Sequence, residues 1–314
     1  MTTATARIPF ASVLLITTPV LAIADGPAPP AGRIAADVAA LVGFGTRHSL
    51  SDQNDRAADW LAGRFRELGY DEVGFHEFAI GGRTRRNVIA TIRGTSHADE
   101  VVLVGAHYDS RNRRIGDAEG PAPGAVDNAS GTAALLELAR SLAGDADRPG
   151  RTVRLIAFSG EEQGLVGSRA YANTAKEAGT TIALMINLDM IAHPMDEDGL
   201  AIVVERDSGL RDPENDEDSA SWASRLESHV RDAGLIPSPG PLYGSDYMPF
   251  EAIGVPCVGL FDGADRAPFY HDEADTPDRV DPDYCAAATL ATLSLIREAA
   301  DPGFAPGRRG HEAP

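Results

Sequence analysis

Cysteine and positive charge are both scarce in this chain of 314 residues. Its two cysteines, Cys257 and Cys285, are too few for a metal site built from thiolates. Both stand in apolar stretches, so two buried thiols and one disulfide are equal alternatives. Lysine and arginine number 28 against 47 aspartates and glutamates, which gives a formal charge of −19. We therefore expect no nucleic-acid partner and no anionic membrane partner, because either needs a basic face.

The N-terminal apolar stretch, residues 8–24, is short for a membrane span. Two threonines and a proline interrupt it, whereas a spanning helix needs about 20 predominantly apolar residues. The stretch follows a single arginine and ends in the small-x-small pattern AIA, which is typical of a signal cleavage site. We predict an export signal over residues 1–24, cleaved near Ala24; because the segment before the apolar stretch is only weakly positive, an uncleaved anchor is the alternative. The mature protein is then secreted or periplasmic, with no stable membrane association.

The rest of the chain has the composition of one globular domain. Hydrophobic residues make up 43% and charged residues 24%, which suits a protein with a sizeable core. Residues 25–32 are rich in proline and glycine and are predicted to be a linker. Residues 33–301 show no internal repeat and form the predicted domain, and residues 302–314 form a predicted disordered tail.

Apolar runs typical of strands alternate with helical segments along this domain. Several of the runs are continuous valine, isoleucine and leucine, which favours an α/β fold with a largely parallel sheet covered on both faces. The acidic segment 196–218 is expected to be a solvated loop. Strands are predicted near residues 73–78, 87–92, 101–106, 152–158, 182–188 and 255–261. Helices are predicted for residues 52–68, 130–142, 161–175, 219–233 and 282–300.

Polar side chains follow these strands at the points where the strands end. Each one has a simple structural explanation: His107 suits a core, Asp127 could cap a helix, and Glu161 and Glu162 could favour a helix start. Since carboxyl ends of parallel strands meet at one edge of a sheet, we expect the group to lie close together. The full group is His107, Asp109, Asp127, Glu161, Glu162, Asp189 and His271.

So many carboxylates buried together would be strongly unfavourable without a cation. Imidazole nitrogens and carboxylate oxygens, with no thiolate, suit zinc in an open catalytic site. Cobalt and manganese accept the same ligands. The surplus of carboxylates indicates two ions that share a bridging group.

Six stretches of the sequence resemble the M28 family of di-zinc exopeptidases. They occur in the order found in that family, and the resemblance runs from about Leu41 to about Ala300. It implies a three-layer α/β/α sandwich with a mostly parallel, mixed central sheet. The stretches are VVLVGAHYDS, PGAVDNASGTAALLELAR, LIAFSGEEQGLVGSRAYA, INLDMIAH, YGSDYMPF and YHDEADTPD.

The resemblance also implies roles for the ligands. Asp127 would bridge two zinc ions. His107 and Asp189 would complete the ligands of one ion, and Glu162 and His271 those of the other. A cis peptide bond is implied after Asp127.

The catalytic roles come from the same resemblance. Glu161 would be the general base, and Asp109 would orient the imidazole of His107. Tyr270 or Tyr247 would hydrogen-bond the tetrahedral intermediate, and the sequence does not choose between these two tyrosines.

The function implied is an exported metallo-aminopeptidase acting on peptides with a free N-terminus, since the free α-amine would meet an acidic site. Three alternatives stay open. A glutaminyl cyclase-like acyltransferase shares the fold but uses one zinc, and the presence of Asp127 with the Glu161-Glu162 pair favours two. A non-catalytic ectodomain would have lost ligands. A carboxypeptidase of the related di-zinc families would need an added lid domain.

Overall fold

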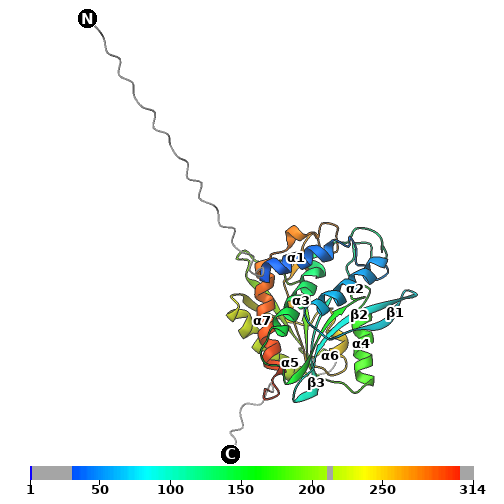
Figure 1. The fold of residues 1–314 in the computed structure, drawn as a ribbon, viewed down its shortest axis with the longest axis vertical. Coiled ribbons are helices and arrows are strands. Elements are labelled where there is room, and N and C mark those ends of the chain that lie inside the picture. The colour runs from blue at the N-terminus through cyan, green and yellow to red at the C-terminus, as the bar shows by residue number, and fades with distance from the viewer. Residues whose placement is uncertain (2–29, 211–214, 305–314) are drawn as a thin grey trace, which may run out of the picture.

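An eight-stranded sheet forms the centre of the computed structural model, which describes residues 1, 30–210 and 215–304 (Figure 1). Residues 2–24 of the predicted export signal lie outside this described part. The strand order is β1-β2-β4-β3-β5-β8-β6-β7. The strands are β1 (Glu72–Ile80), β2 (Arg83–Ile92), β3 (His97–His107), β4 (Arg151–Phe158), β5 (Thr181–Leu188), β6 (Ala201–Arg206), β7 (Ile236–Pro241) and β8 (Cys257–Phe261).

The middle of the sheet is parallel and its outer pairings are mixed. Strand β3 pairs in parallel with β4 and β5, and β5 pairs in parallel with β8. Strands β1, β2 and β4 pair antiparallel, and so do β8 and β6. The central strand β3 is buried from Val101 to His107, as expected for a strand covered on both faces. The predicted mostly parallel, mixed sheet is confirmed.

Helices cover both faces of the sheet and complete three layers. One core cluster joins one sheet face to α1 (Pro30–Val42), α2 (Asp52–Glu67), α3 (Ser130–Ala143), α5 (Asp216–Asp232) and α7 (Pro282–Ala300). A second cluster joins the other face to α4 (Val166–Glu177) and α6 (Met248–Glu251). Helix α2 shows why such segments fold this way. Ser51 caps its first turn, and Ala57, Leu61 and Phe65 recur on the buried face.

Three predicted boundaries differ from the structure. Helix α1 begins at Pro30, so it overlaps the last three residues of the predicted linker. Helix α4 begins at Val166 instead of residue 161, because residues 161–165 form a turn that ends with Gly164 and Leu165 at positive φ. The segment 196–218 was expected to be a loop, but it contains β6 and the start of α5.

Strands β6 and β7 escaped prediction for local reasons. Strand β6 is six residues long and stands in an acidic neighbourhood. Strand β7 has the sequence IPSPGP, and prolines argue against a strand unless it lies at a sheet edge. It is indeed the edge strand, so its pairing with β6 is set by its tertiary neighbour.

The structure also shows the state of the two cysteines and the contacts of residues 302–304. Cys257 and Cys285 are free and buried, so the alternative of two buried thiols holds. Residues 302–304, expected to begin the disordered tail, include Phe304, whose ring lies 5.5 Å from that of Trp222. The remaining residues of the tail lie outside the described part. Within residues 30–210 and 215–304, no helix has the length and apolar character needed to cross a bilayer.

Two helical glycines should respond in opposite ways to alanine. A Cβ at Gly131, in the first turn of α3, would lie 2.4 Å from the carbonyl oxygen of Leu188 on β5. Gly131→Ala should therefore lower the free energy of unfolding by about 1–3 kcal/mol through overpacking. Gly63, inside α2, has nothing within 4 Å of such a Cβ. Gly63→Ala should therefore raise the free energy of unfolding by about 0.5–1 kcal/mol. Urea unfolding measures both, and equal shifts would contradict the close approach of α3 to β5.

Candidate metal centre

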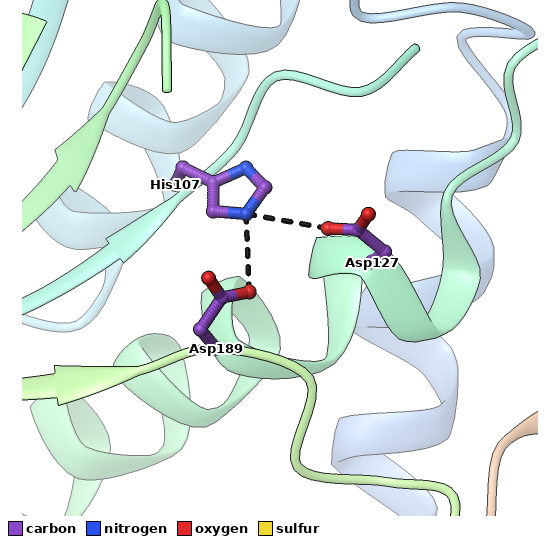
Figure 2. A group of neighbouring side chains, drawn as sticks. All are labelled: His107, Asp127 and Asp189. Carbon is purple, nitrogen blue, oxygen red and sulfur yellow. Dashed lines mark hydrogen bonds and ion pairs between the residues drawn. The ribbon is translucent and has the colours of Figure 1, made fainter. Parts of the chain in front are cut away.

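His107 ends β3 at the carboxyl edge of the sheet and directs one ring nitrogen at two carboxylates. Its Nε2 lies 3.2 Å from Asp189 Oδ1 and 3.3 Å from Asp127 Oδ1 (Figure 2). The other nitrogen, Nδ1, lies 3.1 Å from the backbone carbonyl oxygen of Asp109. A carbonyl only accepts, so Nδ1 carries a proton, and a neutral ring would then keep its lone pair on Nε2. His107 is thereby prepared to bind a metal through Nε2.

Asp127 is shared between two groups of possible ligands. Its Oδ1 faces His107, and its Oδ2 lies 3.0 Å from His271 Nε2. His271 Nε2 also lies 3.0 Å from Glu162 Oε2. One group is His107, Asp127 and Asp189, and the other is Asp127, Glu162 and His271, each with its ligand atoms within 4.8 Å of one another. The structure thus brings together all five predicted ligands.

A carboxylate from a distant loop holds the turn that carries Asp127. Asp275 accepts hydrogen bonds from the backbone N–H groups of Val126 at 2.9 Å and of Asp127 at 3.0 Å. Asn128 donates to the carbonyl of Leu188 at the end of β5. The peptide bond between Asp127 and Asn128 is cis, as the family resemblance implied. Sequence reasoning missed Asp275, although it stands inside the stretch YHDEADTPD.

Arg47 is a fully buried cation beside the centre, and sequence reasoning missed it as well. Its guanidinium donates to the backbone carbonyls of Leu41, Tyr108, Pro123 and Gly124. These contacts join the chain that follows His107 to the chain that precedes Asp127. Burial lowers the pKa of Arg47 to about 10, so the side chain stays charged near neutral pH and offsets part of the carboxylate charge.

Asp109 positions the turn that carries the two adjacent glutamates. Its buried carboxylate accepts from the backbone N–H groups of Glu161 and Glu162, both at 3.3 Å, and from the hydroxyl of Ser49 at 3.1 Å. The same carboxylate lies 3.7 Å from His107 Nδ1. The backbone carbonyl of Asp109 is therefore the closer acceptor for the imidazole, and its carboxylate chiefly orders the glutamate turn.

The two glutamates point to different places. Glu162 turns toward His271 and also accepts from Arg111 Nε at 2.8 Å through Oε2, while its buried Oε1 has no hydrogen-bond partner. Glu161 instead lines a hollow of about 60 Å³ together with Asp189 and other residues. A buried carboxylate oxygen without a hydrogen-bond donor is unfavourable. Oε1 of Glu162 is such an atom, and a bound cation would satisfy it.

The pKa values of the centre follow from burial and crowding. Burial raises the pKa of Glu161, and it raises that of Glu162 to about 7. Burial acts on His271 in the opposite sense, but hydrogen bonds with Asp127 and Glu162 raise the pKa of this imidazole to about 9. Burial also opposes ionised Asp127, yet hydrogen bonds with two imidazoles hold its pKa below the usual range. These carboxylates require nearby positive charge, which divalent cations supply while leaving the imidazoles neutral.

The structure distinguishes the two candidate tyrosines. Tyr270 lines the hollow, and its ring stacks on the imidazole of His271 with 3.6 Å between centroids. The hydroxyl of Tyr270 has no hydrogen-bond partner among the described residues. The hydroxyl of Tyr247 is already engaged, with Glu205 Oε1 at 2.7 Å and the backbone N–H of Tyr243 at 2.6 Å. Tyr270 is therefore the better placed of the two.

Ser245 supports the remaining ligand and was not singled out from the sequence. Its hydroxyl donates to Asp189 Oδ2 at 2.7 Å and accepts from Asn187 Nδ2 at 2.9 Å. Asn187 and Asp189 lie two residues apart on and after β5, so their side chains share one face of the sheet. The stretch YGSDYMPF thus reaches the centre through its serine.

Comparison of sequences places these residues in a known family context. The profile of Peptidase family M28 matches residues 87–296. A curated relative from Pyrenophora tritici-repentis (strain Pt-1C-BFP), named a probable zinc metalloprotease, is 41% identical over 187 residues. That similarity covers 53% of this chain and 43% of the relative, so the chain spans less than half of the relative's length.

Solved structures share the fold. The aminopeptidase LapA of Legionella pneumophila has a TM-score of 0.73 at 19% identity, over 86% of this chain and 72% of that one. A glutaminyl cyclase of Bacteroides thetaiotaomicron, solved with N-acetylhistamine, has a TM-score of 0.69 at 20% identity, over 85% of this chain and 97% of that one. At such identities the likeness concerns the fold.

Removal of the Asp275 carboxylate should weaken metal binding without removing a ligand. Asp275→Ala frees the backbone N–H groups that fix Asp127, and we expect zinc affinity to fall by about 10–100-fold, the usual cost of losing such support. Competition with a chromophoric chelator measures the affinity. Asp278→Ala, at an exposed aspartate of the same loop, is the matched control and should bind zinc as the parent does. Unchanged affinity in Asp275→Ala would contradict the role given to this carboxylate.

Proposed function

This chain belongs to peptidase family M28, and from that premise we propose that it is a metallo-aminopeptidase, which removes N-terminal residues from peptides. One observation carries the proposal: two complete groups of nitrogen and oxygen ligands share Asp127. Glu161 lines the hollow beside them but belongs to neither group. This is the arrangement of a hydrolytic site in which one acid is kept free for proton transfer.

Zinc is the proposed metal, with two ions per chain. His107, Asp127 and Asp189 would hold one ion, and Asp127, Glu162 and His271 the other. The naming of the curated relative as a probable zinc metalloprotease supports this choice, and cobalt or manganese would fit the same donors. Bound zinc would supply Lewis acidity, which polarises a carbonyl and lowers the pKa of water.

Glu161 is the proposed general base and general acid. Its carboxylate faces the hollow, and Asp109 fixes its backbone from behind. Glu161 takes a proton from the attacking water and returns it to the leaving amine, which needs a pKa near the working pH. Burial raises the pKa of Glu161, in the direction that this role requires.

Tyr270 is the proposed donor to the oxyanion of the tetrahedral intermediate. Its ring is fixed by stacking on His271, so its unengaged hydroxyl is held at the hollow before the reaction begins. A fixed donor of this kind costs little reorganisation in the transition state.

The electrostatics of the hollow favour a free α-amine. Its lining includes the four acids Asp189, Glu161, Glu205 and Asp265, and a protonated N-terminus among them would favour their ionised forms. We infer exopeptidase action from this property.

Glutaminyl cyclase activity is the second candidate, because such an enzyme shares the fold over 85% of this chain. The two ligand groups around Asp127 weigh against cyclase activity, since a single zinc ion would leave either His271 or Asp189 without a metal to bind. Formation of pyroglutamate from an N-terminal glutamine peptide, without release of the first residue, would support this alternative.

Substitution of the adjacent glutamates should separate a base from a ligand. Glu161→Gln removes the proton acceptor and keeps both ligand groups, so we expect turnover to fall at least about 100-fold with zinc content unchanged. Glu162→Gln removes one ligand carboxylate and should lose about one equivalent of zinc. Metal analysis and aminoacyl-anilide hydrolysis measure the two effects. Zinc loss in Glu161→Gln, with retention in Glu162→Gln, would reverse these assignments.

Blocking the substrate amine should abolish hydrolysis. Removal of the positive charge takes away the attraction between the α-amine and the acids of the hollow, so an N-acetylated aminoacyl-anilide should be cleaved at least about 100-fold more slowly than the free form. Zinc-reconstituted protein is assayed with both substrates. Equal cleavage would refute aminopeptidase action, and fewer than one bound metal per chain would refute the two-ion site.

A further inference from the structure

A second hollow of about 660 Å³ adjoins the one at the metal centre. The two hollows share four lining side chains, Glu205, Asp265, Tyr243 and Phe261. Because these residues line both spaces, the two hollows lie directly beside one another. We call the second hollow the side pocket. The remaining walls of the side pocket are largely apolar and include Met195. The four shared residues, two acids and two with aromatic rings, lie where the two hollows meet.

Glu205 is the deepest of these four groups. It is 3% exposed and sits on β6, where it pairs with Gly259 of β8. A Cβ at Gly259 would lie 2.4 Å from Glu205 Oε2, so the glycine leaves room for this carboxylate. Oε1 accepts from the hydroxyl of Tyr247 at 2.7 Å. Among the described residues Oε2 has no hydrogen-bond partner, and this oxygen is not fully buried, so it is open to a ligand in the hollows.

The sheet register sets the depth of Glu205 below the centre. Gly259, its partner, also pairs with Asn187 on β5. Asp189, a ligand of the centre, follows Asn187 by two residues, which is about 6.6 Å along a strand. Glu205 therefore lies below the ligands on the same face of the sheet, at a depth comparable to the four-carbon stem of lysine or the stem of arginine.

A cationic side chain satisfies this pocket better than an apolar one. Oε2 of Glu205 has no donor among the described residues, and an ammonium or guanidinium group in the hollow would supply a charge-assisted hydrogen bond. The rings of Tyr243 and Phe261 can cover an aliphatic stem and attract a cation by their faces. Burial raises the pKa of Glu205 to about 8, a shift that a bound cation would oppose. Arg266 also lines the pocket, but it is exposed and can keep its charge in water.

We propose that the side pocket selects peptides whose first residue is lysine or arginine, with Glu205 as the residue that determines this specificity. The proposal rests on the proposed aminopeptidase function. It names the substrate class of that site, and Asp265 adds a second negative charge at the mouth of the pocket.

Matched substrates test the charge separately from the shape. Lysyl, arginyl and norleucyl p-nitroanilides are compared by kcat/KM on the zinc-loaded full chain, since norleucine has the four-carbon stem of lysine without the ammonium. We expect lysine or arginine to exceed norleucine by at least about ten-fold, the worth of one charge-assisted hydrogen bond. A preference for norleucine over both cationic residues would overturn the proposal.

Variants assign the preference to a residue. Glu205→Gln keeps an acceptor for Tyr247 but removes the charge, and should reduce the ratio of cationic to norleucyl substrate by about ten-fold. Asp265→Asn, at a partly exposed position, should reduce it by a smaller factor because solvent screens its charge. Glu197→Gln removes the same charge at an exposed loop position outside the pocket and should leave the ratio unchanged. An unchanged ratio in both pocket variants would overturn the role of the pocket.

A binding measurement separates this proposal from the proposed function. Lysinamide and norleucinamide are titrated calorimetrically into zinc-loaded Glu161→Gln protein. Tighter binding of lysinamide, together with no anilide hydrolysis by the parent, would refute aminopeptidase action and support the pocket. Hydrolysis by the parent with equal binding of the two amides would support aminopeptidase action and refute the pocket.

Discussion

The rest of the site depends on one shared carboxylate, Asp127. Each of its oxygens faces a different imidazole, so a single residue joins two groups of ligands into one centre. Its position is fixed by backbone hydrogen bonds to Asp275 and by the tie between Asn128 and the end of β5. The central strands then need only deliver His107 and Asp189 to the same edge of the sheet, which parallel pairing does.

The candidate metal centre concentrates several carboxylates in a buried space, and neighbouring groups offset part of their charge. Arg47 brings a buried cation whose guanidinium donates to four backbone carbonyls, and Arg111 donates to Glu162. The carboxylate of Asp109 accepts hydrogen bonds from the backbone of the glutamate turn. In this turn Glu161 lines the hollow and Glu162 lies toward His271. The two adjacent acids therefore lie in different surroundings, and the buried carboxylate of Asp109 orders the turn that carries both.

Much of the fold and most of the centre were readable in the sequence. Continuous apolar runs marked the parallel strands, and polar residues at or after the ends of several runs marked the predicted ligands, because both signals are local. The misses were of another kind. Asp275, Ser245 and Arg47 act through backbone or side-chain contacts with residues far away in the chain. Strand β7 forms despite its three prolines because it lies at a sheet edge, where proline is tolerated.

The sequence by itself determined the family and the fold class, and it pointed to the five predicted ligands, since each stands in a short ordered motif. Only the tertiary structure chose Tyr270 over Tyr247, by showing that the hydroxyl of Tyr247 is already bonded to Glu205. Only the tertiary structure, likewise, placed Glu205 opposite Gly259 beneath the centre. Pairing between β6 and β8 joins segments separated by two helices and another strand, and no local pattern in either segment specifies that register.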